Sequence, residues 1–214
     1  SQTVLSAVSG ESLSAEHPKV ALVLSGGGAR GFSHVGVIKV LEELGVKVDI
    51  VTGTSMGAMV GGGYASGYSV EQMQEIILGV DWNEMFALRP DRSEINWRRR
   101  QDDFKGLGSG EIGFSDGKAL FPDSVVPAQH LEIFLRSITK HVSSVTDLSR
   151  LPIPFAAVAT DLDNGEAVVM QKDVSLADAM RASMSVPGAF SPFPFKKHVL
   201  VDGGLSQNLP VEQA

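Results

Sequence analysis

Two units of the same kind open the ordered part of the chain. In each, a short run rich in β-branched apolar residues is followed by a glycine-rich turn and then by a helical segment. Val20–Leu24 precedes Gly26–Gly31, and Val46–Val51 precedes Gly53–Gly57. A strand–helix–strand–helix order predicts a parallel sheet with right-handed crossover connections, and therefore an α/β domain.

The two helices are indicated by different signals. After the second turn an Ala- and Gly-rich segment runs to about Ser66. After the first turn, apolar side chains recur at the helical period and Gly45 is well placed to end the helix. These recurring side chains are Val37, Val40, Leu41 and Leu44.

The rest of the chain is expected to form one domain with these units. Asn164-Gly165 is a strong hairpin signal between two strands, and Ser175 followed by Asp178 resembles a helix capping box. The expected elements are a helix over Val70–Leu78, a long loop or hairpin over 104–118, a helix over Pro127–Val142, strands over Pro154–Leu162 and Ala167–Gln171, a helix from Ser175 to about Ser183, and a strand over Val199–Val201. Residues 1–18 are polar and Ser-rich, which is typical of a flexible leader, and 19–214 form the predicted single domain.

The composition excludes several classes of protein. Lys and Arg total 18 against 25 Asp and Glu, a net charge of −7, whereas a nucleic-acid binder normally carries a basic stripe. The chain has no cysteine, so it has no disulfides, thiol nucleophile or zinc–thiolate site. No run of about 18 apolar residues exists, so we expect no transmembrane helix. Nothing in the pattern calls for a metal or a cofactor.

Gly53-Thr54-Ser55-Met56-Gly57 is the strongest indication of chemistry. A G-x-S-x-G sequence between a strand and a helix is typical of a nucleophile turn, in which the serine has a strained backbone and an exposed hydroxyl. Glycines two residues before and two after remove Cβ atoms that would collide in so sharp a turn. The helix N-terminus would favour negative charge developing near Ser55. The alternative is a helix N-cap in a glycine-rich turn.

Gly26-Gly27-Gly28-Ala29-Arg30-Gly31 is consistent with an oxyanion loop. Acyl transfer passes through a tetrahedral oxyanion, which backbone N–H groups stabilise by roughly 3 kcal/mol each. Consecutive glycines let the backbone approach that oxygen closely, while Arg30 could orient the loop or add positive charge. A plain packing turn is the alternative without chemistry.

The same glycines also satisfy the dinucleotide-binding pattern G-x-G-x-x-G. Asp49 lies at about the right sequence distance to bind a ribose, but it falls inside the second predicted strand and not at its C-terminal end. No Lys-Ser or Lys-Thr follows the glycines, which argues against a phosphate loop of nucleotide hydrolases.

A base for Ser55 has to be found without an obvious histidine. In α/β hydrolases the histidine follows the acid in sequence, and no histidine follows Asp202. Asp202 comes directly after an apolar strand and before two glycines, so it can emerge at a strand end. A partly desolvated aspartate gains the basicity that an exposed one lacks. His34 and His198 are alternative bases, and a simple turn aspartate is the interpretation without function.

Three motifs in this order resemble the patatin-like phospholipases: Gly26–Gly31, Gly53–Gly57 and Asp202-Gly203-Gly204. The resemblance covers about Lys19 to Gln213. Arg181-Ala182-Ser183 through Pro187 and Phe190, and Asn208 to Val211, are also similar to the family.

The resemblance implies a three-layer α/β/α fold with a mainly parallel central sheet. It also implies calcium-independent acyl hydrolysis by a Ser–Asp dyad, with Ser55 as nucleophile and Asp202 as base. Gly26, Gly27, Gly28 and Arg30 then supply the oxyanion loop. The substrate would be a phospholipid or lysophospholipid at a membrane surface. Family domains usually continue beyond the aspartate motif, so we expect this chain to be truncated at its C-terminus.

Within the family, Ile95–Asp103 resembles bacterial members fused to an outer-membrane barrel, whose patatin-like domain is exported. We therefore expect a secreted or cell-surface protein, with the cytoplasm as the alternative. Trp82, Phe86 and Trp97 form a hypothetical membrane anchor if exposed together. Arg98–Arg100 is either a head-group contact or a solvated charge run. The sequence does not decide the oligomeric state, and a homodimer stays open.

Two classes of function remain. The first is a lipid acyl hydrolase. The second is a non-catalytic lipid- or nucleotide-binding module on the same fold, against which the paired Ser55 and Asp202 argue. Methionines such as Met56, Met59, Met73 and Met85 either line an acyl-chain pocket or pack in the core.

Overall fold

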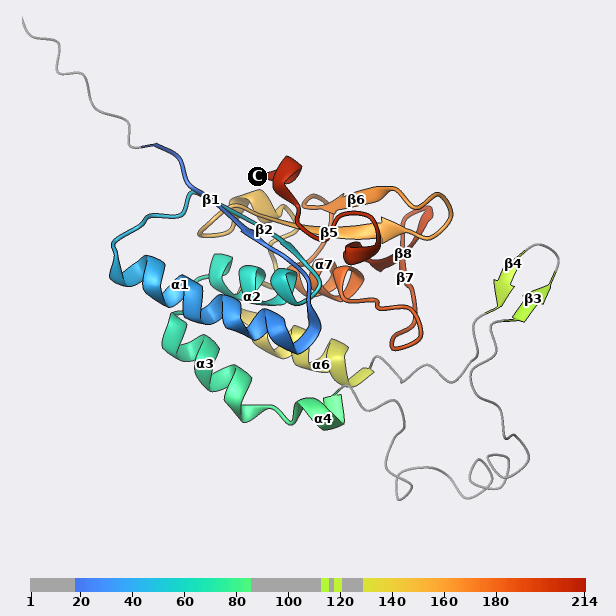
Figure 1. Ribbon diagram of the computed structural model, residues 1–214, viewed down its shortest axis with the longest axis horizontal. Coiled ribbons are helices and arrows are strands. Elements are labelled where there is room, and N and C mark those ends of the chain that lie inside the picture. The colour runs from blue at the N-terminus through green and yellow to red at the C-terminus, as the bar shows by residue number, and fades with distance from the viewer. Residues whose placement is uncertain (1–17, 86–112, 116–117, 121–128) are drawn as a thin grey trace, which may run out of the picture.

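A six-stranded mixed sheet lies at the centre of the domain (Figure 1). The computed structural model describes residues 18–85, 113–115, 118–120 and 129–214. The strands of the sheet are β1 (Ala21–Leu24), β2 (Ile50–Thr54), β5 (Phe155–Asp161), β6 (Ala167–Met170), β7 (Phe193–Phe195) and β8 (His198–Asp202), while β3 (Gly113–Ser115) and β4 (Lys118–Leu120) form a separate antiparallel pair.

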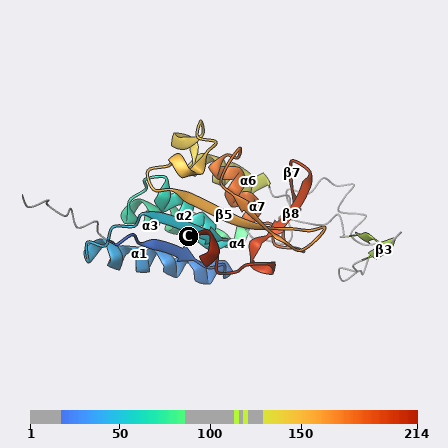
Figure 2. The same cartoon turned by 90° about the horizontal axis from the view of Figure 1, so that it is seen from above.

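The helices are grouped beside this sheet. They are α1 (Ser33–Glu43), α2 (Met56–Ala65), α3 (Val70–Gly79), α4 (Trp82–Met85), α6 (Gln129–Ile138) and α7 (Leu176–Ser183), with 3-10 helices η1 (Gly28–Phe32), η2 (Lys140–Val142), η3 (Leu148–Arg150), η4 (Gly203–Leu205) and η5 (Val211–Gln213). In Figure 2, α1 lies along the lower margin of the molecule and α6 along its upper side.

The parallel part of the sheet is β1–β2–β5. Both connections, through α1 and then α2, move in the same direction across the sheet. Crossovers of one hand then place both helices on the same face, and Figure 1 shows α1, α2 and α3 together on one side. The remaining pairs, β5–β6, β5–β8 and β7–β8, are antiparallel. The α/β class is confirmed, but the sheet is mixed and not mainly parallel, because the chain returns by hairpins after β5.

β5 pairs with three strands although a strand has only two edges. Residues 157 and 158 pair with both β2 and β6, and residues 159 and 160 pair with both β6 and β8. β6 therefore occupies one edge, and β2 and β8 share the other. β2 ends at Thr54 opposite Val158, whereas the antiparallel β8 ends at Asp202 opposite Ala159. The C-terminal ends of β2 and β8 consequently meet at adjacent positions of β5.

The two faces of the sheet are covered differently. A Cβ on Gly61 of α2 would touch Leu24, Val51 and Phe155, so these side chains face the helices. Alternate residues face the other way. There, the hydroxyls of Thr52 and Thr54 donate to the carbonyls of Pro210 and Gln207, each at 2.9 Å. Within the described residues the predicted third layer is therefore the C-terminal segment with η4 and η5.

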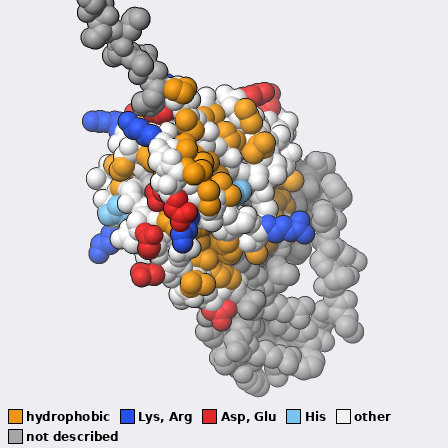
Figure 3. Space-filling view, turned by 60° about the vertical axis from the view of Figure 1, so that its left-hand side comes forward, with side chains coloured by type: hydrophobic (Ala, Val, Ile, Leu, Met, Phe, Trp, Pro, Cys, Tyr) orange, Lys and Arg blue, Asp and Glu red, His pale blue; other side chains and the backbone are white. Residues whose placement is uncertain are grey.

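Helix α2 is central and α1 is peripheral. Every residue of α2 is buried, whereas α1 buries Val35 and Ile38 and leaves Val37 and Val40 exposed, as is Leu44 directly after the helix. The helical period thus predicted α1 correctly from side chains that mostly point outward. Figure 3 shows hydrophobic side chains gathered in a band on the face it presents, with charged side chains on both sides.

Several predicted boundaries are confirmed and two shift. Gly45 follows α1 with φ +71° and Gly165 turns the β5–β6 hairpin with φ +73°. The second strand begins at Ile50 and not at Val46, because Val46 still belongs to the turn that ends α1: its N–H donates to the Leu41 carbonyl at 2.9 Å. The helix predicted over Pro127–Val142 is α6 followed by η2, and β7 was not predicted.

Candidate active site

Ser55 directly follows β2 and has φ +53° and ψ −122°. A positive φ is strained for a residue with a Cβ and is held only where the surroundings enforce it. The flanking glycines leave no space for side chains. A Cβ on Gly53 would overlap the Gly57 carbonyl, and a Cβ on Gly57 would overlap the Leu24 carbonyl at the end of β1. The predicted steric reason for both glycines is therefore present in the fold.

The glycine loop runs past Ser55 and is tied to the C-terminal segment. A Cβ on Gly26 would lie 2.7 Å from Asn208 Oδ1 and 3.1 Å from Ser55 Cβ, and the Gly26 N–H donates to the Asn208 carbonyl at 3.2 Å. Gly28 has φ +55°. The N–H groups of Gly27 and Gly28 donate to no atom of the described residues. They are thus available to an oxygen atom in the cavity beside them.

Arg30 is placed differently from the glycines. Its side chain is exposed and does not line the cavity that contains Ser55. Its backbone shapes the loop instead, since its N–H donates to the Gly27 carbonyl at 3.3 Å and its carbonyl accepts from the Ser33 hydroxyl at 2.8 Å. The geometry favours orientation of the loop over direct contact with an oxyanion.

Asp202 ends β8 and is 7% exposed. Its Oδ1 accepts from the Gly204 N–H at 2.7 Å. Its Oδ2 is buried and has no partner of hydrogen-bonding geometry among the described residues. Burial raises the pKa of the carboxyl above its ordinary value of 3.8, while the Ser55 hydroxyl and the Gly204 N–H lower it by less. A desolvated carboxylate with one unused oxygen can accept a proton.

One cavity of about 230 Å³ brings these groups together. Its wall combines the glycine loop, the serine and aspartate, and apolar side chains, of which Val186 and Leu205 are exposed at 41% and 64%. The lining residues are Gly26, Gly27, Gly28, Ser55, Val186, Pro187, Asp202, Gly204, Leu205 and Asn208. Of the sequence-predicted site residues, all but Arg30 line it.

The described histidines do not line this cavity. His198 Nδ1 pairs with Asp161 Oδ2 at 2.6 Å, and this hydrogen bond is the main reason why the pKa of Asp161 lies below its ordinary value. His34 Nε2 contacts the Ser25 carbonyl at 2.9 Å, just before the glycine loop. Neither alternative base is thus placed to act on Ser55, and His34 supports the loop.

Other predicted contributors lie elsewhere or outside the described residues. Trp82 is partly buried and packs against Phe32 and Phe134, with ring centroids 4.6 Å and 5.7 Å away. Met59 and Met73 line a second, small cavity between helices, without Ser55. Phe86, Trp97 and Arg98–Arg100 lie outside the described residues.

Sequence reasoning assigned no role to several residues that the fold brings to the site. Asn208 lines the cavity and holds Gly26. Ser183 contacts the backbone of Ser55, and Ser185 contacts that of Asp202. All three belong to stretches that were noted for their resemblance, and that was the one signal pointing to them.

Comparison with known proteins agrees with this geometry. The family model described as patatin-like phospholipase matches residues 22–214. The chain belongs to the patatin-like phospholipase family. An uncharacterized NTE family protein of Mycobacterium tuberculosis is 34% identical over 194 residues, which cover 91% of this chain and 45% of that protein. Human patatin-like phospholipase domain-containing protein 6 is 35% identical over 202 residues, covering 91% of this chain and 12% of its own length.

The patatin-like chain is also similar to a named lysophospholipase and to a solved structure. Lysophospholipase NTE1 of Lodderomyces elongisporus is 33% identical over 192 residues, covering 90% of this chain and 11% of the relative. The crystal structure of VipD from Legionella pneumophila has a TM-score of 0.57 at 21% identity, covering 90% of this chain and 47% of that chain. This last likeness concerns the fold alone. The chain spans less than half the length of these relatives.

Membership in the patatin-like family leaves the dinucleotide interpretation without support, and the structure adds a geometric reason. Asp49 lies before β2, whereas the glycine loop follows the C-terminal end of the parallel β1, so the two are at opposite ends of the sheet. Among the described residues, no helix is long and apolar enough to cross a membrane.

Proposed function

We propose that this domain hydrolyses acyl esters of phospholipids or lysophospholipids through a Ser55–Asp202 dyad. The observation that carries the proposal is the shared cavity: the strained serine, the buried aspartate and the glycine loop with its unused N–H groups all line it. The other function considered, a non-catalytic binding module, would not need a desolvated carboxylate beside a strained serine.

In the first half of the reaction, Ser55 Oγ attacks the ester carbonyl carbon and its proton passes to Asp202. Oδ2 is the accepting oxygen, because Oδ1 is held by the Gly204 N–H. The carbonyl oxygen becomes an oxyanion, for which the N–H groups of Gly27 and Gly28 are the donors. The intermediate then expels the alcohol, which takes the proton from Asp202, and the acyl group remains on Ser55.

In the second half, water attacks the acyl-serine carbonyl and gives its proton to Asp202. A second oxyanion forms in the same place and collapses, and Ser55 leaves with the proton that Asp202 returns. The product is a free fatty acid. The raised pKa of Asp202 suits both steps, since a stronger base accepts the proton more readily as long as it is ionised at the working pH.

The proposed substrate class rests on the shape and lining of the site. Val186, Pro187 and Leu205 form an apolar wall beside Ser55, which suits an acyl chain. All three residues are exposed, as expected where a lipid enters from a membrane surface. One relative is named a lysophospholipase, which supports the same class. Dyad chemistry of this kind requires no metal ion, so calcium independence is part of the proposal.

Location and assembly stay predictions. Export was predicted from Ile95–Asp103, which lies outside the described residues, and the cytoplasm is the alternative. Fractionation of cells that carry the full-length gene decides between them. Analytical ultracentrifugation of the purified chain decides whether a homodimer forms.

The test of the function is fatty-acid release from phosphatidylcholine and lysophosphatidylcholine vesicles with excess chelator, comparing wild type with Ser55→Ala. Loss of a serine nucleophile can lower kcat by a factor on the order of 10⁶, so release should fall to background. Equal release by the two proteins would disprove the dyad. Binding without release by folded wild type would favour the binding module.

A further inference from the structure

The strained backbone of Ser55 is held by a hydrogen bond from its own N–H group. That N–H donates to the hydroxyl of Ser183 at 2.8 Å, and the same hydroxyl donates to the Val158 carbonyl at 2.5 Å. Ser183 is the last residue of α7 and is fully buried. One hydroxyl thus joins the backbone of the nucleophile to the central strand.

The position of this hydroxyl follows from the sheet register. In the parallel β2–β5 ladder, Val51 pairs with Phe155 and its N–H donates to the Pro154 carbonyl. Such rungs recur every second residue, so a continued strand would join the Ser55 N–H to the Val158 carbonyl. The Ser183 hydroxyl stands between these two groups. It keeps the rung connected while the backbone of Ser55 turns away from the sheet.

The same segment also holds the base. The Asp202 N–H donates to the carbonyl of Ser185 at 2.9 Å, two residues after Ser183. The side chain of Ser185 takes no part in this contact: its hydroxyl binds Arg181, accepting from Nη1 at 2.6 Å and donating to the carbonyl at 3.0 Å. Both dyad backbones are therefore attached to one short piece of chain.

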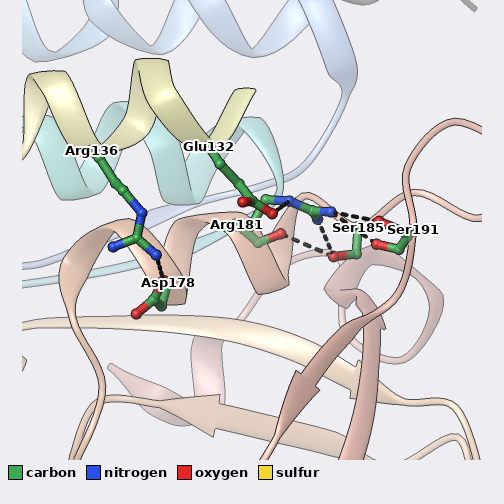
Figure 4. Close-up of polar contacts among 6 residues, drawn as sticks. All are labelled: Glu132, Arg136, Asp178, Arg181, Ser185 and Ser191. Carbon is green, nitrogen blue, oxygen red and sulfur yellow. Dashed lines mark hydrogen bonds and ion pairs between the residues drawn. The ribbon is translucent and has the colours of Figure 1, made fainter. Parts of the chain in front are cut away.

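Arg181 fixes that piece of chain in place (Figure 4). Its guanidinium is 2% exposed, contacts Glu132 of α6 at 3.3 Å, and donates to the Ser191 carbonyl at 3.0 Å. These contacts span the turn that carries Val186 and Pro187, which line the catalytic cavity. The end of α7 is thus anchored on both sides.

We propose that Ser183 is a positioning residue for catalysis: its hydroxyl replaces the missing β-ladder rung and holds Ser55 in its reactive conformation. This inference rests on the proposed function, since it assumes that Ser55 is the nucleophile. Misplacing a reacting atom by about 1 Å can cost on the order of 10²-fold in rate. We therefore expect Ser183→Ala to lower kcat by about a hundredfold and to leave KM nearly unchanged.

Ser66→Ala is the control. It removes a buried hydroxyl that donates to the Gly63 carbonyl at 2.8 Å, at the far end of α2 from Ser55 and outside the cavity. Both variants lose buried hydrogen bonding, and urea unfolding measures how much stability each of them loses. Only Ser183→Ala should slow the labelling of Ser55 by a fluorophosphonate, followed by mass spectrometry of the peptide.

A second pair of variants distinguishes the effect of losing the hydroxyl from the effect of changing the side-chain volume. Ser183→Thr and Ser183→Val add the same extra bulk, but threonine alone keeps the hydroxyl. We expect the threonine variant to label at least tenfold faster than the valine variant. Equal rates for that pair, or equal rates for Ser183→Ala and Ser66→Ala, would overturn the positioning role. Failure of wild type to be labelled at Ser55 would instead overturn the proposed function.

Discussion

The two glycine-rich turns beside the cavity contain glycines that are required for opposite reasons. In the nucleophile turn, Gly53 and Gly57 are surrounded by backbone atoms that leave no space for a Cβ. In the glycine loop, Gly28 has open space around it and needs glycine for its φ of +55°. Gly53 and Gly57 are therefore required by close packing, and Gly28 is required by its backbone conformation. Substitutions at these positions should accordingly affect different properties of the domain.

The largest expected effect on the rate of hydrolysis comes from a substitution outside both glycine-rich turns. Asp202→Asn should lower kcat by a factor on the order of 10⁶, as loss of the base does in a serine triad. The rate that remains measures what the turns achieve without a base. Vesicle hydrolysis at saturating substrate is the measurement. A loss of less than about tenfold would show that another group accepts the proton.

The same variant should be more stable than wild type at neutral pH. Since burial raises the pKa of Asp202, its ionised form is disfavoured in the folded state. Wild type therefore gains stability as the pH falls through the raised pKa, and this gain is complete below the unfolded value near 3.8. The amide of the Asp202→Asn variant does not titrate and has no such dependence. Urea unfolding at pH 7.5 and at pH 4, close to the unfolded value, should show the difference shrinking toward acid pH, whereas a constant difference would contradict the raised pKa.

Gly57→Ala tests the packed turn. Its Cβ would overlap the Leu24 carbonyl, and overpacking against rigid backbone costs about 3 kcal/mol. We expect the unfolding free energy to fall by about that amount and hydrolysis to be lost with it. Urea denaturation and the vesicle assay together give the result. A stable, active variant would mean that β1 and the turn are farther apart than the structure shows.

Gly28→Ala tests the open loop. Alanine fits the space, but the left-handed conformation costs it about 1 kcal/mol, so the domain should stay folded. The loop N–H groups should shift, and kcat should fall about tenfold or more with KM little changed, because each oxyanion donor contributes roughly 3 kcal/mol in the transition state. Unaltered kcat in a folded variant would remove the loop from the oxyanion site.

Gly36→Ala should have the smallest effect on stability and activity, and it serves as the control for the substitutions in both turns. Gly36 lies in α1 with no atom near its Cβ position, so neither constraint applies. Alanine should stabilise the helix by about 0.5–1 kcal/mol and leave hydrolysis unchanged. Thermal unfolding detects the gain. Destabilisation here would show that glycine substitutions in this domain act through something other than local space and φ.

The local pattern predicted the elements near the site well and the later topology less well. The β1–α1 and β2–α2 units and the hairpin at Asn164-Gly165 follow from short-range signals, namely apolar runs, glycine turns and helical spacing. The antiparallel return of β8 and the existence of β7 depend on pairing between distant segments. Short apolar runs carry no information about their partner strand, so that pairing could not be predicted from them.

By itself the sequence determined that a serine would stand on a sharp turn between strand and helix, and that a glycine loop would lie one strand away. It did so because steric exclusion and backbone conformation act over a few residues. Only the tertiary structure decided that Asp202 lies next to that serine, since β2 and β8 end at adjacent positions on one edge of β5. It also decided the contact of Ser183 with the Ser55 N–H, because a hydroxyl acquires that position only when α7 packs against the sheet.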